Sequence, residues 1–208
     1  GAGALDILVS NFATKAGIAG LEFLSGIPGT IGGAICMNAG AYGRELSDIF
    51  VSAEAIDRFG IVHQLNPSDL SFSYRSSNLS RDLILINARL RGVPCSRESI
   101  NSKVSRIKSE RELTQPIRKR TGGSTFKNPV ASELRAWELI DMSGCRGLTR
   151  GGATVSNLHC NFLINSGSAT AADIEGLGED IQDRVFDQTG KELEWEIKRI
   201  GSTFGDAR

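Results

Sequence analysis

A glycine-rich run from Ser25 to Gly43, SGIPGTIGGAICMNAGAYG, constrains this chain more than any other segment. Glycine lacks a Cβ atom and tolerates positive φ, so Gly26, Gly29, Gly32 and Gly33 permit tight turns whose backbone N–H groups can face a phosphate or a flat ring. The run therefore favours a nucleotide-type cofactor that lies against the backbone. The alternative is a turn used only for close packing of a helix on a sheet, and the run alone does not separate the two.

Composition and charge set the outer limits. A chain of 208 residues that is 40% hydrophobic and 23% charged fits one or two domains with a real core. Its 24 basic and 24 acidic residues cancel, so we expect no nucleic-acid partner and no attraction to an anionic membrane. We expect no obligate protein partner either. No apolar run reaches the roughly 18 residues of a membrane span, and no signal-peptide pattern opens the sequence.

The four cysteines favour a reducing environment. They are too scattered for a CxxC motif and too few for a secreted disulfide scaffold. They predict reduced thiols and a cytoplasmic location, and the spacing of His, Cys, Asp and Glu predicts no metal site. The cysteines are Cys36, Cys95, Cys145 and Cys160.

The hydrophobic pattern predicts a mixed α+β fold. In the first half we expect a helix over 5–16 that ends at Gly17, a β-hairpin over 51–65 that turns at Asp57–Gly60, and a strand over 83–90. A charged helix should follow the Gly92–Ser96 breaker. In the second half we expect a short helix over 134–142, a helix capped by Thr170 and ended by Gly190, and a closing strand over 193–200.

Three polar segments are candidates for chemistry. Arg75 lies among small hydroxyl residues in FSYRSS, a setting suited to a planar fork that holds a carboxylate or phosphate, although a plain surface arginine is the alternative. In TGGSTFKNP two glycines expose Ser124, and a simple polar turn is the alternative there. Glu194 and Glu196 should share one face of the closing strand, where a solvated pair is the commoner outcome.

Five segments in this order, SGIPGTIGGAICMNAGAYG, FSYRSS, GGSTFKNP, GGATVSNLHCNFLIN and LEWEIKRIG, resemble the UDP-N-acetylenolpyruvoylglucosamine reductase (MurB) family. The resemblance covers the chain to about Gly201. It implies a flavoenzyme in which NADPH reduces FAD, and hydride then reaches the enolpyruvyl double bond of UDP-N-acetylglucosamine enolpyruvate to give UDP-N-acetylmuramate for peptidoglycan. It also implies the C-terminal part of a PCMH/VAO-type FAD-binding domain over 1–95, followed by a MurB-type α+β substrate domain over 96–208.

The resemblance assigns roles to individual residues. Arg75 and Glu196 match the family's groups that stabilise the anionic intermediate, and Ser124 matches the serine that donates the quenching proton. Tyr74, Lys127 and Asn128 are similar to substrate-binding positions. His159 lies in a family-like segment, where we expect a structural hydrogen bond rather than acid-base catalysis. The positions expected to approach FAD are Gly26, Ile27, Pro28, Gly29, Thr30, Gly33, Asn38, Ala39 and Gly40.

The sequence also departs from the family pattern. Trp195 stands where family members often have proline, and the short link between Arg75 and Leu83 resembles the subclass without a long tyrosine-bearing loop. The family's second glycine-rich turn, a GxGSN-like element in an N-terminal lobe, is expected before the point where this sequence starts. Two hypotheses follow: an active reductase, or a non-catalytic module that binds a UDP-sugar but cannot hold FAD.

Overall fold

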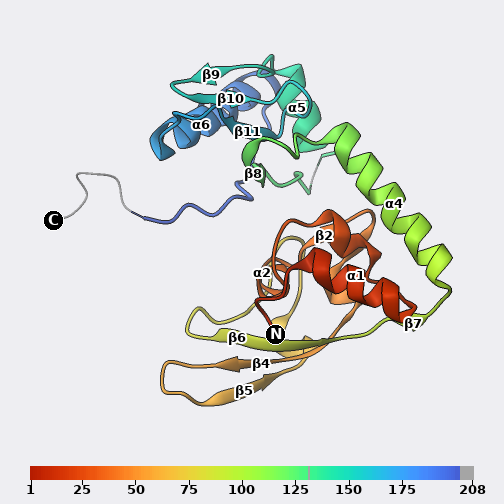
Figure 1. The fold of residues 1–208 in the computed structure, drawn as a ribbon. Coiled ribbons are helices and arrows are strands. Elements are labelled where there is room, and N and C mark those ends of the chain that lie inside the picture. The colour runs from red at the N-terminus through yellow and green to blue at the C-terminus, as the bar shows by residue number, and fades with distance from the viewer. Residues whose placement is uncertain (131, 202–208) are drawn as a thin grey trace. The chain divides into compact units, whose positions relative to one another are not determined.

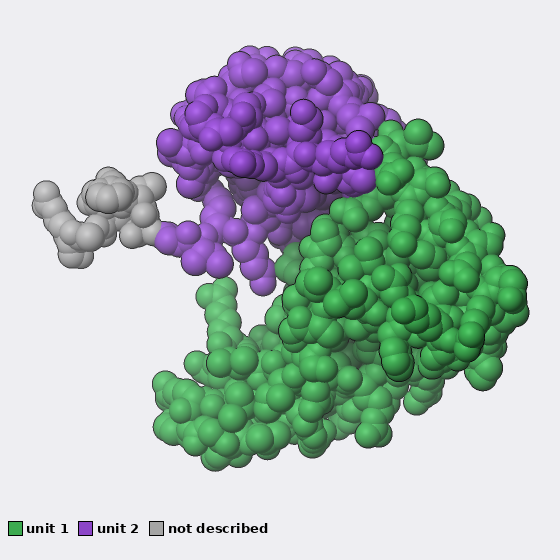
Figure 2. All heavy atoms as spheres, in the orientation of Figure 1, with its two compact units in different colours: residues 1–113 green, residues 114–208 purple. Residues whose placement is uncertain are grey.

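The computed structural model describes residues 1–130 and 132–201, which divide into two compact units, 1–113 and 114–208 (Figures 1 and 2). Each unit has its own sheet and its own hydrophobic core. The mixture of helices and antiparallel sheets confirms the predicted α+β class.

The first unit is built around a three-stranded antiparallel sheet in the order β5-β4-β6. Two short strand pairs, β1 with β7 and β2 with β3, accompany it. The elements of this unit are α1 (Asp6–Ala16), β1 (Ile18–Ala19), η1 (Glu22–Gly26), α2 (Ile31–Met37), β2 (Gly40–Ala41), β3 (Arg44–Glu45), η2 (Leu46–Asp48), β4 (Phe50–Ile56), β5 (Val62–Leu65), α3 (Pro67–Leu70), β6 (Ile84–Leu90), β7 (Val93–Pro94) and, except for its last residue, α4 (Arg97–Thr114). The predicted hairpin and the strand after it are therefore confirmed.

The second unit pairs a four-stranded antiparallel sheet, β8-β11-β10-β9, with two helices. Helix α6 packs on β9, β10 and β11 and buries Leu177, Ile181 and Val185. Its first turn has the predicted cap, in which the Thr170 side chain accepts from the Asp173 N–H, and Gly190 ends it with φ 66°. The elements are β8 (Arg120–Ser124), α5 (Ala136–Met142), β9 (Thr149–Arg150), β10 (Ala153–Val155), β11 (Phe162–Asn165) and α6 (Ala171–Thr189).

The division between the units differs from the boundary expected at 95/96, because it falls after Leu113. The apolar stripe of α4 explains the difference: Ile100 and Val104 form a buried cluster with Ala19, and the Ile107 carbonyl accepts a hydrogen bond from the Tyr42 hydroxyl. The charged helix is therefore packed into the first unit. The far end of the second expected domain, 202–208, lies outside the described residues.

The predicted closing strand over 193–200 is wrong. Trp195 forms only an isolated antiparallel bridge with Phe126. The flanking backbone bonds are from the Lys127 N–H to the Glu194 carbonyl and from the Glu196 N–H to the Thr125 carbonyl. The centre of the Trp195 ring lies 4.9 Å from the centre of the Phe126 ring. The indole also packs against Gly178 of α6 so closely that a Cβ atom at position 178 would lie only 2.0 Å from it. This aromatic anchor, rather than a ladder of hydrogen bonds, fixes the segment.

Replacing Gly178 with alanine should therefore destabilise the second unit. Alanine favours a helix by about 1 kcal/mol over glycine, but its methyl group would displace Trp195 from a packed position, a class of change that typically costs about 1–3 kcal/mol. Urea unfolding followed by tryptophan fluorescence measures the net effect. Gly176→Ala on the same helix is the matched control, since its methyl group would meet the guanidinium end of the long Arg150 side chain rather than a packed aromatic ring. Equal stabilities of the two variants would contradict the anchor.

Candidate functional site

The glycine-rich run spans η1, α2 and β2, and most of its glycines are required by close approach to the chain itself. A Cβ on Gly26 would lie 2.6 Å from the Tyr42 ring, one on Gly32 would lie 3.2 Å from Ala2, and one on Gly40 would lie 2.8 Å from the Arg44 carbonyl oxygen. Gly33 is exposed, and a Cβ there meets only Thr30 at ordinary distance. Close packing within the chain thus explains several of the glycines, whereas the surface of the run at Gly33 is open to a ligand.

The residues expected to approach FAD differ in how they are exposed. Pro28 and Gly33 are exposed, and most of the others are half-buried. Thr30 caps α2, where its hydroxyl accepts from the Gly33 N–H. Asn38 is fully buried, and its side chain contacts Ser73 and Ser47. Any contribution of Asn38 to a cofactor site would therefore come from its backbone.

Asp6 lies directly behind Gly29 and is the most unusual titratable group of the first unit. It is fully buried, and neither carboxylate oxygen has a hydrogen-bond partner in the described part of the chain. A Cβ on Gly29 would lie 3.1 Å from Asp6 Oδ2. Burial raises the pKa of Asp6 to about 6, because an ionised carboxylate is poorly solvated there. The expected apolar helix thus buries a carboxyl group, while Leu8 and Phe12 are exposed.

The Arg75 side chain is fixed to the end of the glycine-rich run. Its Nη2 donates to the Gly40 carbonyl oxygen at 3.0 Å, and its guanidinium lies 4.9 Å from the centre of the Tyr74 ring. Arg75 has φ 54°, which is uncommon for a residue with a side chain. Two predicted site residues and Gly40 of the run therefore form one cluster in the first unit.

In the second unit, Ser124 and Glu196 are brought together by the backbone. Ser124 ends β8, and the next residue, Thr125, accepts from the Glu196 N–H at 2.8 Å. Glu196 is half-buried, whereas Glu194 is exposed and forms an ion pair with Lys127. The proposed proton donor and carboxylate thus lie on neighbouring chain segments, and Glu194 and Glu196, which were expected to share one face of a strand, differ in exposure.

Asn161 holds this arrangement together, and the sequence did not single it out. Its amide accepts from the Phe126 N–H at 2.9 Å and donates to the Phe126 carbonyl at 2.8 Å, and its own carbonyl accepts from the Thr125 N–H. The only available signal was its place in the GGATVSNLHCNFLIN segment. Next to it, the Thr125 hydroxyl is buried without a hydrogen-bond partner in the described residues.

The remaining predicted residues have identifiable structural contacts. The side-chain Oδ1 of Asn128 accepts from the Ala136 N–H at the start of α5. His159 packs edge-on against Phe162 with ring centres 4.8 Å apart, its Nδ1 accepts from the Asn161 N–H, and burial lowers its pKa. All four cysteines are free thiols. Within residues 1–130 and 132–201, no group of three His, Cys, Asp or Glu side chains could hold a metal, and no helix is long and apolar enough to cross a membrane.

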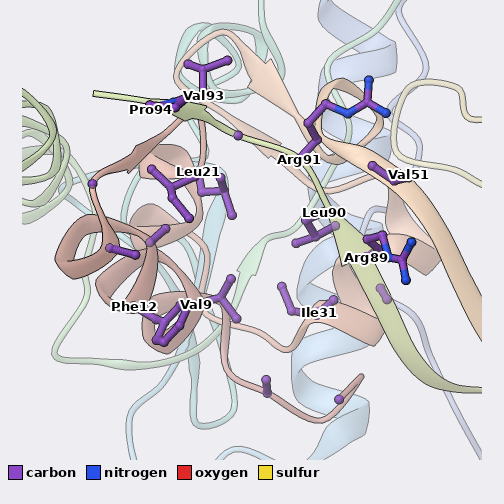
Figure 3. A pocket seen from close by; sticks show the side chains of 18 residues that line it. Val9, Phe12, Leu21, Ile31, Val51, Arg89, Leu90, Arg91, Val93 and Pro94 are labelled. Carbon is purple, nitrogen blue, oxygen red and sulfur yellow. The ribbon is translucent and has the colours of Figure 1, made fainter. Parts of the chain in front are cut away.

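An apolar groove of about 760 Å³ lies in the first unit between α1 and strands β6 and β7 (Figure 3). Val9 and Phe12 contribute from the helix, and Leu90 contributes from β6. Arg89 and Arg91 line it from the same segment. No predicted site residue lines this groove, so it is separate from the Arg75 cluster.

Comparison with known proteins places both units in one family. The family model "UDP-N-acetylenolpyruvoylglucosamine reductase, C-terminal domain" matches residues 115–200, and the model "FAD binding domain" matches residues 1–66. The crystal structure of UDP-N-acetylenolpyruvylglucosamine reductase from Thermus caldophilus superposes with a TM-score of 0.83 at 37% identity, over 95% of this chain and 70% of that one. This chain belongs to the UDP-N-acetylenolpyruvoylglucosamine reductase family.

Curated relatives agree and also show how much of them the chain represents. The reductase of Rhodopseudomonas palustris strain HaA2 is 56% identical over 100% of this chain and 66% of its own length. The reductase of Parvibaculum lavamentivorans is 56% identical over 97% of this chain and 64% of its own length. The chain therefore spans just under two thirds of the length of these relatives.

The buried Asp6 predicts a specific dependence of stability on pH. Its folded pKa of about 6 lies above the ordinary value of 3.8, so the native state holds the proton more tightly than the unfolded state. The contribution of Asp6 to stability is fully present below pH 3.8 and is lost as pH rises through about 6, a loss of a few kcal/mol. Asp6→Asn, which cannot ionise, should lose much less stability between pH 4.5 and pH 7.5 in urea unfolding. Parallel losses in the two proteins would contradict a protonated, buried Asp6.

Proposed function

We propose that this chain is the main part of an FAD-dependent UDP-N-acetylmuramate dehydrogenase, which uses NADPH to reduce UDP-N-acetylglucosamine enolpyruvate in peptidoglycan precursor synthesis. Family membership supports the activity, and the observation that carries it is the backbone bond from the Glu196 N–H to the Thr125 carbonyl, which puts the segment with Glu196 beside the segment that carries the proposed proton donor Ser124. Bound FAD would supply the hydride chemistry. A cytoplasmic location goes with this proposal, because the UDP-sugar is a cytoplasmic metabolite in such a pathway.

The chain's own residues then divide into a cofactor wall and a substrate site. The surface of the glycine-rich run at Pro28 and Gly33 is open, so the backbone from Gly26 to Thr30 and from Asn38 to Gly40 would lie against FAD. Arg75, whose guanidinium is oriented by the Gly40 carbonyl, would neutralise the substrate carboxylate as negative charge develops beside it. Tyr74, which stacks under that guanidinium, would help to shape the same pocket.

In the second unit, Ser124 would hold and deliver a proton. Hydride addition to the enolpyruvyl group leaves carbanion character next to the carboxylate, and a hydroxyl within hydrogen-bond reach can quench it. Glu196 would stabilise the same anionic centre by donating a hydrogen bond. Lys127 and Asn128 would contact the substrate at the rim, where Lys127 already carries an ion pair with Glu194 that an anionic substrate would have to replace.

Ser124→Ala should separate the two half-reactions. General-acid help is worth about 10² to 10⁴ in rate, so oxidation of the reduced flavin by the enolpyruvyl substrate should slow by about that factor. Reduction by NADPH should stay unchanged, because it needs no proton from Ser124. Anaerobic stopped-flow absorbance measures both steps, and Ser166→Ala, an exposed serine of the same unit, is the control. Equal losses in both steps would contradict the role of Ser124.

A second candidate is a module that binds a UDP-sugar without holding FAD. It is favoured by the glycines at 26, 32 and 40, whose missing side chains face the chain's own atoms and so need no cofactor to explain them. Visible absorption after incubation with FAD and gel filtration separates the candidates. The reductase predicts a yellow protein, whereas a colourless protein that binds the UDP-sugar in calorimetry would establish the module.

A further inference from the structure

The Arg75 backbone is held in a conformation that arginine rarely adopts. Ser73 and Ser76 exchange two backbone hydrogen bonds of 3.1 Å, which leaves Tyr74 and Arg75 at the tip of a two-residue turn. Arg75 has φ 54°, a backbone angle that favours glycine or asparagine. A side chain in the left-handed region persists only when its surroundings over-determine it. The contacts that flank the turn must therefore supply that restraint.

Asn38 supplies the restraint on one side. Its side chain is fully buried, its Nδ2 donates to the Ser73 carbonyl at 3.0 Å, and its Oδ1 accepts from the Ser47 N–H at 3.0 Å. Asn38 also ends α2 with φ 42°, so the amide is aimed from a fixed backbone position. A buried amide with both ends bonded across 35 and 9 residues of sequence is a specific tie between segments.

The opposite flank and the guanidinium are tied to the same glycine-rich run. The Ser77 hydroxyl donates to the Cys36 carbonyl at 3.0 Å, and Arg75 donates to the Gly40 carbonyl at 3.0 Å. Residues 36, 38 and 40 thus contact residues 77, 73 and 75 in turn. Of these three residues of the run, Asn38 is the most deeply buried, because it is fully buried whereas Cys36 and Gly40 are half-buried.

We propose that Asn38 is a positioning residue for Arg75: its amide locks Ser73 and thereby sets the strained turn that aims the guanidinium at the substrate. The inference rests on the proposed function only for what Arg75 then binds. It gives the Asn38 side chain a task in the substrate half-reaction instead of in cofactor binding. Flavin affinity should therefore depend little on this amide, and substrate reduction should depend on it strongly.

Two variants separate the bonds. Asn38→Asp keeps an acceptor for the Ser47 N–H but loses the Nδ2 donor to the Ser73 carbonyl, whereas Asn38→Gly removes both bonds and tolerates the left-handed backbone. Asn66→Gly is the matched control, because it removes the cap of α3 in the same unit without touching the Arg75 turn.

Trypsin cleavage of the FAD-free protein tests the turn without any activity. Cleavage after Arg75 should rise about tenfold in both Asn38 variants, because loss of a buried hydrogen bond makes local opening more frequent. Cleavage after Arg58, at the exposed tip of the β4–β5 hairpin, should stay at the wild-type rate and serves as the internal standard. An unchanged ratio of the two cleavage rates, or an equal rise in Asn66→Gly, would overturn the proposal.

The half-reactions test the consequence for Arg75. In both Asn38 variants, flavin oxidation by the enolpyruvyl substrate should slow by about tenfold or more, while FAD affinity from flavin fluorescence stays within about twofold of wild type. Loss of FAD affinity with an unchanged substrate step would overturn the positioning role. If wild-type flavin is not oxidised by the substrate at all, the proposed function fails, and the trypsin ratio alone decides whether Asn38 sets the turn.

Discussion

Close approach of the glycine-rich backbone to its own chain is the constraint on which the first unit depends. Tyr42 occupies the space that a side chain at position 26 would need, and Arg44 does the same at position 40. Because Gly40 has no side chain, the Arg75 guanidinium can reach its carbonyl oxygen. The run is therefore a packed core segment on one side and an open surface at Gly33 on the other, which reconciles the two interpretations of its composition.

In the second unit, contacts of two side chains fix the segment that carries Glu196. Asn161 pairs with both backbone groups of Phe126, and Trp195 packs between Phe126 and Gly178. These contacts hold the segment after α6 against the end of β8, so a single backbone bridge brings Glu196 next to Thr125. A few buried contacts, rather than a long strand, fix the proposed catalytic groups of this unit.

Local signals made much of the fold predictable from the sequence. Gly17 and Gly190 end their helices, and the Thr170 cap and the turn at Asp57–Gly60 act within a few residues. The errors arose where distant contacts decide the outcome. The closing segment has a strand-like composition, but its conformation depends on contacts with Phe126. The apolar stripe of α4 predicts a buried face but does not show which of the two units that face packs against. Arg75, Ser124 and Glu196 could be proposed from motifs, whereas the Asn38 and Asn161 ties could not, because their partners lie 35 residues away.

The central claim is that the open side of the glycine-rich run forms a wall of an FAD site. Amide hydrogen exchange with and without FAD measures this directly, since bound cofactor slows exchange where it covers or orders the backbone. The account predicts slower exchange at residues 26–40, and in the neighbouring turn at residues 73–77. Unchanged exchange in both segments while FAD is bound would contradict it.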